Sequence, residues 1–181
     1  MSLSKIFRSA TFLIFLTVGL FVSIDVLALP DDRQQTISIE SDSAERNQKT
    51  GLTVYSGNVI ISQGSILIEA DEITLHYEGS KISRIECNGT PASYQQKPQM
   101  EGAMLVARAE HIDYLLADDK IFLKRNAVLS RNGTIVKGDS IDYDMKNETW
   151  KAKGNDLGEQ KRIQLVIPPS VQNSTPPKET P

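Results

Sequence analysis

Apolar and polar residues alternate with a period of two through most of residues 36–167. This is the spacing of a β-strand that buries one of its two faces. No part of the stretch shows the three-and-four spacing of an amphipathic helix. Turn-forming pairs such as Gln63-Gly64 and Asn132-Gly133 separate the alternating segments. The pattern therefore predicts an all-β body of about sixteen short strands.

A six-residue phrase with an acid at its fourth position occurs four times. The acids are Asp42, Asp71, Glu110 and Asp139, and the steps between them are 29, 39 and 29 residues. The first and third copies, like the second and fourth, are therefore 68 residues apart. Internal repetition of this kind is typical of stacked, solenoid-like architectures. A repeating surface suits an extended partner better than it suits a single catalytic pocket.

The four acids are expected at corners of the strands. Ile68 and Ile73 lie five positions apart around Asp71, so an uninterrupted strand would place them on opposite faces. If both face inward, the chain bends between them, and the acid at the bend can accept hydrogen bonds from nearby backbone N–H groups. Identical corners in a stack line up along an edge. A catalytic pair such as Asp71 and Asp139 would instead have to converge on one site.

Regular corners and short strands together predict an extended β-jellyroll, in which antiparallel V- or C-shaped layers stack by backbone hydrogen bonds. Such a stack has open ends, where the N–H and C=O groups of the first and last strands are unpaired. Head-to-tail addition of another β-roll would pair both ends and build a filament. The expected edge-strand assembly residues are Thr36, Ile37, Ser38 and Ile39 at one end, and Arg162, Ile163, Gln164, Leu165 and Val166 at the other.

Large aliphatic residues and tyrosines occupy most of the expected inward positions. A layer of short strands closes poorly along one side, which favours a lengthwise apolar groove for an elongated lipid or peptide. The same side chains would equally form a filled core, and the sequence leaves both alternatives open. The candidate lipid-binding residues are Ile37, Ile39, Tyr55, Val59, Ile61, Ile68, Ile73, Leu75, Tyr94, Val106, Ile112, Tyr114, Leu116 and Phe122.

The first 28 residues predict a secretory signal peptide that is cleaved after Ala28. Lys5 and Arg8 precede an apolar run over residues 11–24, and short side chains lead up to the cleavage position. The run is shorter than the roughly 20 residues that a membrane-spanning helix needs. Residues 29–167 are then the folded domain, and the proline-rich tail 168–181 is expected to be disordered.

Composition and the absence of catalytic motifs exclude several classes of function. With 20 basic and 23 acidic residues and a formal net charge of -3, the chain has no basic footprint for nucleic acid. Its one cysteine, Cys87, lies in an apolar-patterned stretch and is expected to be buried. His76 and His111 fall at outward positions. We find no metal-ligand spacing, nucleophile motif or glycine-rich nucleotide loop. The sequence therefore predicts a protein that is not an enzyme and that uses no cofactor or metal.

Several phrases occur in the order and spacing of a known family. They are Thr36–Asp42, Tyr55–Gly64, Ile66–Asp71, Gly89–Tyr94 and Lys137–Tyr143. Together they resemble the OstA-like family, to which the periplasmic component A (LptA) of the lipopolysaccharide transport bridge belongs. The resemblance covers about residues 36–166, nearly the whole chain after the leader.

The resemblance implies a Gram-negative periplasmic β-jellyroll of about sixteen strands. It also implies a groove that carries the acyl chains of lipid A. The partners would be the inner-membrane-anchored C component, the outer-membrane D component and further copies of the chain. Groove positions of the family match Ile37, Ile39, Tyr94, Tyr114 and Leu116 here. Tyr94 departs from the phenylalanine often found there, and its hydroxyl needs a partner or a water.

Three hypotheses follow, and the first is favoured. The chain is a lipopolysaccharide-binding transport protein that bridges the inner and outer membranes and shields lipid A for outer-membrane assembly. Shielding is required because each exposed methylene costs about 0.8 kcal/mol in water. The alternative is a non-enzymatic periplasmic scaffold that assembles end to end without lipid cargo. The third hypothesis is a glycan-acting enzyme that uses the corner acids.

Overall fold

The fold is described from a computed structural model, which describes residues 32–97, 102–155 and 162–169. The expected signal peptide (1–28) lies outside the described residues, as does the tail from residue 170 onward. No helix in the described part is long and apolar enough to cross a membrane.

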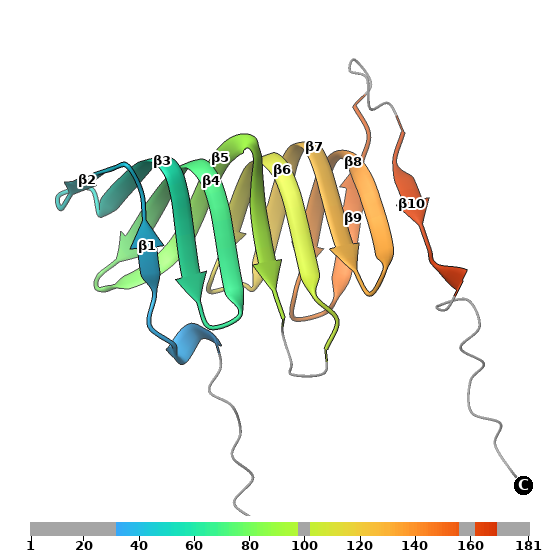
Figure 1. Ribbon diagram of the computed structural model, residues 1–181, viewed down its shortest axis with the longest axis horizontal. Helices are drawn as coiled ribbons and strands as arrows, with labels where there is room; N and C mark the ends of the chain where they lie inside the picture. Colours follow the sequence, from blue (N-terminus) through green and yellow to red (C-terminus); the bar gives the residue numbers. More distant parts are fainter. Residues whose placement is uncertain (1–31, 98–101, 156–161, 170–181) are drawn as a thin grey trace, which may run out of the picture. The chain divides into compact units, whose positions relative to one another are not determined.

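The described residues are almost entirely β, as predicted (Figure 1). A three-residue 3-10 helix, η2 (Asp32–Gln34), precedes the first strand. The strands are β1 (Ser38–Glu40), β2 (Ser43–Asn47), β3 (Leu52–Gln63), β4 (Ile66–Glu78), β5 (Lys81–Gln96), β6 (Leu105–Leu115), β7 (Lys120–Arg131), β8 (Thr134–Asp144), β9 (Thr149–Lys153) and β10 (Gln164–Val166).

All ten strands belong to one antiparallel sheet with the order β1-β3-β4-β5-β6-β7-β8-β10. In addition, β2 pairs with β3 and β9 pairs with β8. The register breaks near the middle of every pairing from β3–β4 to β7–β8. Each strand from β3 to β8 is therefore bent, and the sheet folds into two arms that face each other. Figure 1 shows the arms as a front and a back row of strands.

The first arm is defined here by β2, β9 and the strand segments that run with them. These segments are residues 52–56, 72–78, 81–88, 111–115, 120–124 and 140–144. The second arm consists of β1, β10 and residues 59–63, 66–70, 92–96, 105–109, 127–131 and 134–138. The bends join the arms along one edge, and the hairpin turns form two rows of tips along the other.

The expected number of about sixteen short strands needs a correction, because the described residues form ten strands. Bulges at the bends interrupt the register without ending the strand. Six long strands therefore supply a segment to each arm, and four short strands supply one segment each. The sequence marks the bends correctly, but it does not show that the strand continues through them.

The corner acids lie at these bends, as expected. Asp42 stands between β1 and β2, and Asp71 and Asp139 are each the one residue skipped where the register breaks. Glu110 holds the same position between β6 and β5. The donors that the structure shows for their carboxylates are side chains on neighbouring strands or, for Asp139, just after β9, not the expected backbone N–H groups. One example is the amide of Asn58, which lies 3.0 Å from the carboxylate of Asp42.

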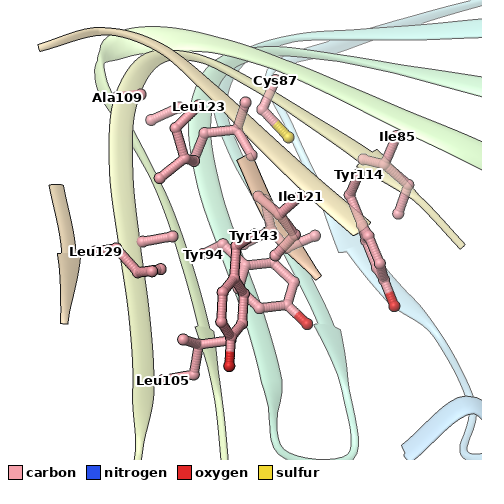
Figure 2. Packing of buried hydrophobic residues seen from close by; sticks show 14 of the residues in the cluster. Ile85, Cys87, Tyr94, Leu105, Ala109, Tyr114, Ile121, Leu123, Leu129 and Tyr143 are labelled. Atoms are coloured by element: carbon pink, nitrogen blue, oxygen red, sulfur yellow. The ribbon is translucent and has the colours of Figure 1, made fainter. Parts of the chain in front are cut away.

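The core fills the space between the two arms, which is called the interior below. On the second arm, cross-strand neighbours place Ile61, Ile68, Tyr94, Ala107, Leu129 and Val136 in one inward row. On the first arm, a second row contains Leu75, Ile85, Tyr114, Ile121 and Tyr143. All of these side chains are buried in one cluster. The Tyr94 and Tyr114 rings join the rows edge to face, with centroids 5.5 Å apart (Figure 2).

Candidate functional site

Most of the predicted lipid-binding residues line the interior. Tyr55, Ile37, Ile39 and Leu116 are partly buried and pack against the core cluster. Eight more are buried within it, namely Val59, Ile61, Ile68, Ile73, Leu75, Tyr94, Ile112 and Tyr114. The structure thus brings twelve of the fourteen predicted residues together between the arms.

Val106 and Phe122 do not face the interior, and the expected inward orientation is wrong for both. Val106 lies between buried Leu105 and Ala107 in the alternation of β6. Phe122 lies between buried Ile121 and Leu123 in β7 and is paired with Asp113 and Asp142 on the outer face. In β6 the inward positions change from odd to even numbers at the bend, so counting back from Ile112 puts Val106 on the wrong face. In β7 the inward residues keep one parity through the bend, and Phe122 is misassigned because the alternation of β6 does not continue through the turn at residues 116–119.

Near the β1 end the interior is filled in this state. The cavity enclosed between the arms near the β1 end has a volume of about 20 Å³, roughly the room that one water molecule needs. Its walls are apolar and include Ile37, Ile68, Leu75, Ile85 and Tyr114. At this end a lipid chain therefore fits only if the two arms move apart.

A larger hollow opens at the β9 end of the stack. It has a volume of about 530 Å³ and lies between Leu129 and Val136 of the second arm and Tyr143 and Trp150 of the first. Leu129, Val136 and Tyr143 also belong to the buried core cluster. The hollow is therefore an open end of the same interior, and Trp150 forms part of its wall.

Polar side chains connect the two rows of tips on the side opposite the bends, which is called the open side below. Arg33 forms an ion pair with Asp119, in the turn between β6 and β7, and donates to the hydroxyl of Tyr114 at 3.3 Å. At the other end, Arg131 donates to the hydroxyl of Tyr143 at 2.8 Å and to Glu148 at 2.6 Å.

Both arginines are held on the second arm. Arg131 ends β7 there, whereas Arg33 is placed by its neighbour Asp32. The Asp32 carboxylate accepts 2.7 Å hydrogen bonds from the backbone N–H and the hydroxyl of Ser65, and a 3.1 Å bond from Gln96. Burial alone would raise the pKa of Asp32, but these hydrogen bonds lower it overall. The ionised carboxylate therefore fastens η2 to the second-arm tips.

Burial acts in the opposite direction on the pKa of Arg131. Burial lowers this pKa, but the carboxylate of Glu148 and the hydroxyl of Tyr143 raise it overall. The side chain of Arg131 is therefore charged at all relevant pH values. Two permanent cations consequently stand on the tips of the second arm, and the carboxylates that pair with them stand on the first.

Both ends of the sheet expose strand edges. The predicted edge residues fall at these ends, since β1 contains Ser38 and Ile39 and β10 contains Gln164, Leu165 and Val166. Thr36 and Ile37 precede β1, and Arg162 and Ile163 precede β10. The prediction missed β2 and β9, which form the edges of the first arm. The corner at Asp42 is the sequence signal that divides β2 from β1.

Asp71 and Asp139 do not converge on one site, and no metal-binding group is found among the described residues. Asp71 and Asp139 stand on β4 and β8, four strand spacings apart in the sheet order, which is about 19 Å. This distance is too long for a pair of carboxylates that act on one glycosidic bond. No group of three or more His, Cys, Asp or Glu side chains among residues 32–97, 102–155 and 162–169 could hold a metal ion.

The residues on the open side were not predicted from sequence. Arg33 and Asp119 lie far apart along the chain, and Arg131 and Glu148 are separated by 17 residues. No periodicity connects them, because each belongs to a turn or to the end of a strand. The pairing of tips from opposite arms is a property of the bent sheet alone.

Comparison with known proteins finds relatives of this chain among lipopolysaccharide transport proteins. Residues 38–149 match the family model described as LptA/(LptD N-terminal domain) LPS transport protein. The chain is 34% identical to the lipopolysaccharide export system protein LptH of Pseudomonas aeruginosa, over 79% of this chain and 85% of that protein. It is 34% identical to the lipopolysaccharide export system protein LptA of Escherichia coli K12, over 83% of this chain and 80% of that protein.

The similarity extends to three dimensions. The crystal structure of the Pseudomonas aeruginosa LptH is described as that of the LptA-homologous periplasmic component of a lipopolysaccharide transport device. It superimposes with a TM-score of 0.71 at 30% sequence identity, covering 77% of this chain and 100% of that one. The likeness therefore includes the bent-sheet fold in which the interior and the open side are formed.

Proposed function

The chain belongs to the LptA and LptD N-terminal-domain family of lipopolysaccharide transport proteins, and from this premise we propose that it carries lipopolysaccharide through the periplasm. The lipid A acyl chains lie between the two arms, and the saccharide remains in water. A cleaved leader (1–28) delivers the chain to the periplasm.

The observation that carries this proposal is the unbroken double row of buried aliphatic and aromatic side chains between the arms. Each methylene that leaves water for such an interior gains about 0.8 kcal/mol, so a lipid with several acyl chains gains tens of kcal/mol. A row that runs through every layer from β3 to β8 offers this environment along the whole stack. It therefore suits a cargo that moves along the protein.

The open sheet ends support assembly with further β-jellyrolls. Ile163, Leu165, Val166 and Ile167 are all exposed hydrophobic residues at the β10 end. Such an edge can pair with the first strands of another molecule by strand addition. We propose that these ends join copies of the chain head to tail. They also join the stack to the inner-membrane C component and the outer-membrane D component of the transport machinery.

A scaffold without lipid cargo remains the second candidate, because the interior near the β1 end is filled in this state. The two candidates differ in what the arms do. A carrier must let them separate and let lipid replace contacts between the two inward rows. A scaffold keeps them closed and uses only its ends.

The experiment measures binding of purified residues 29–181 to lipopolysaccharide, with Ile39→Glu and Val106→Glu variants alongside. Ile39 packs against the core, so a buried carboxylate there should weaken saturable binding by at least about tenfold. Val106 faces outward, so the same change at this matched site should leave binding intact. A photo-crosslinking residue in place of Tyr114 should capture the lipid.

The carrier proposal fails if the folded wild-type chain associates end to end but binds no lipopolysaccharide. That result would favour the scaffold. Circular dichroism and thermal melting of each variant establish that any loss of binding does not come from unfolding.

A further inference from the structure

The open side contains a pocket that the proposed function does not yet use. Its volume is about 230 Å³, and it lies between the tips of the two arms. Leu105, Tyr143 and Met145 provide its apolar surface, and these residues also pack in or against the core. The charged residues that line it are Arg33, Asp119, Arg131, Lys146 and Glu148. This set is called the open-side pocket below.

The arms cannot separate without breaking the two ion pairs of this pocket. The Arg33–Asp119 and Arg131–Glu148 pairs each join a second-arm tip to a first-arm tip. Their side chains are partly exposed, with relative exposures of 37% and 32% in the first pair and 30% and 63% in the second. Ion pairs in contact with water are weak and exchange partners readily. They can therefore hold the arms closed without preventing them from opening.

Opening of the arms also separates the arginines of these ion pairs from their acids. Both arginines stay on the second arm, and both acids leave with the first arm. The second-arm tips then present the guanidinium groups of Arg33 and Arg131, parted from Asp119 and Glu148, beside the entrance to the apolar interior. The hydroxyls of Tyr94, Tyr114 and Tyr143 point toward the same side (Figure 2), and in the closed state those of Tyr114 and Tyr143 accept hydrogen bonds from Arg33 and Arg131.

We propose that Arg33 and Arg131 exchange Asp119 and Glu148 for a phosphate group of the cargo. The open-side pocket is then a binding site for the phosphate of an anionic amphiphile whose acyl chains enter between the arms. The planar guanidinium group favours this exchange, because it binds carboxylate and phosphate oxygens with the same two-point geometry. The inference rests on the proposed function and identifies the residues that select its cargo.

The test compares the affinities of single variants for two probes, intact lipopolysaccharide and chemically dephosphorylated lipopolysaccharide. Arg33→Gln and Arg131→Gln should each weaken binding of the intact lipid by about tenfold. Both should leave binding of the dephosphorylated lipid unchanged. Asp119→Asn and Glu148→Gln should instead strengthen binding of the intact lipid, because each removes the carboxylate that competes with the phosphate.

Arg125→Gln is the matched control. Arg125 forms a 3.0 Å ion pair with Glu110 at the bends, on the opposite edge from the open side, so its loss should not alter binding of either lipid. Inorganic phosphate as a competitor should displace the lipid only weakly, because it gains nothing from the apolar interior.

Two results would overturn this inference while leaving the carrier function intact. In the first, all four variants at the ion pairs strengthen binding, which would show that the pairs only hold the arms closed. In the second, the arginine variants weaken binding of both lipids equally, which would show that phosphate is not recognised. Failure of the wild-type chain to bind either lipid would overturn the carrier function, and this site with it.

Discussion

At the scale of single residues, the tyrosines show how the interior and the open side are joined. The Tyr94 and Tyr143 rings are buried in the core, but their hydroxyls reach polar partners on the open side. Tyr94 donates to Gln96 at 2.8 Å, and Tyr143 accepts from Arg131. The hydroxyl that distinguishes Tyr94 from phenylalanine is therefore paired, as its burial requires. Burial also raises the pKa of Tyr94, so this hydroxyl remains a donor.

Cys87 is buried, as its apolar surroundings predicted. Burial raises the pKa of its thiol to about 12, with smaller contributions from Asp113 and Glu86. The thiol is therefore protonated near neutral pH and unreactive toward other thiols. Cys87 therefore packs as a small apolar residue of the core.

His111 makes the stability of the domain depend on pH. Its Nδ1 lies 2.8 Å from the amide oxygen of Asn88, and burial, together with Lys124, lowers its pKa below 6.5. The unfolded chain therefore binds a proton more readily than the folded one. The stability associated with neutral His111 is present above about pH 6.5 and is lost as the pH falls through the lowered value.

We therefore predict that wild-type protein loses more unfolding free energy than a His111→Gln variant between about pH 8 and about pH 5. Urea titrations at both pH values, followed by circular dichroism, measure this difference. Equal losses in the two proteins would show that His111 does not contribute.

At the scale of elements, the 68-residue repeat corresponds to four successive bent strands. β3 and β7 occupy residues 52–63 and 120–131, so both of their ends keep the offset. Their corners agree in detail, because Asn58 and Asn126 both adopt a positive φ, 45° and 53°. Each donates to the corner acid of the strand before it, Asn58 to Asp42 and Asn126 to Glu110. The repeat in sequence is therefore a repeat of hydrogen-bonded corners.

The corner acids differ in the number and length of the hydrogen bonds that they accept. Their substitutions should therefore differ in their effect on the unfolding free energy. Glu110 accepts a 2.6 Å hydrogen bond from Asn126 and a 3.0 Å bond from Arg125. Asp71 accepts a 3.4 Å contact from Thr90. Glu110→Ala should therefore reduce the unfolding free energy by about 1 kcal/mol. This corresponds to a fall of about 3 °C in melting temperature.

Asp71→Ala is the matched variant, and it should reduce the unfolding free energy by clearly less than Glu110→Ala does. Differential scanning calorimetry of the two proteins at neutral pH makes the comparison. A larger loss from Asp71→Ala would mean that the acids act through something other than these contacts.

At the scale of the whole molecule, the two ends of the sheet determine how copies can associate. The first layer consists of β1 and β2 and the last of β9 and β10, so each end presents one edge strand per arm. The β10 edge is the more hydrophobic, because Ile163, Leu165 and Val166 are exposed there. An antiparallel sheet with such ends can continue into a second molecule without changing its own fold.

We predict that Leu165→Asp abolishes most of the concentration-dependent association of the chain. Leu165 is 48% exposed at the β10 edge, and a charge there should weaken end-to-end contacts by about tenfold or more. Met104→Asp is the matched control, because Met104 is also 48% exposed but lies at a second-arm tip beside β6. Sedimentation velocity over a range of concentrations measures both variants. If Leu165→Asp and wild type associate equally, β10 does not take part in the contact between copies.

Much of the fold was predictable because its determinants are local. Alternation identified strand-forming residues such as Ile73 and Leu75, and the phrase around Asp71 located a bend. Parity failed across the bend of β6 for Val106 and across the turn before β7 for Phe122, and both were assigned to the wrong face. The strand count failed because a bulge and a strand end have the same signature in sequence. The open-side pairs were not predictable, since their members come from separate turns.

The sequence by itself determined that this chain forms a stacked, bent β-sheet with an apolar interior, because period-two alternation and repeated corner acids act through neighbouring residues. It also carried the family phrases that indicate lipopolysaccharide transport. Only the tertiary structure decided which residues meet across the interior, that the interior is filled near the β1 end, and that arginines of one arm pair with acids of the other. These features depend on how far each strand turns at its bend, which brings together side chains that are distant along the chain.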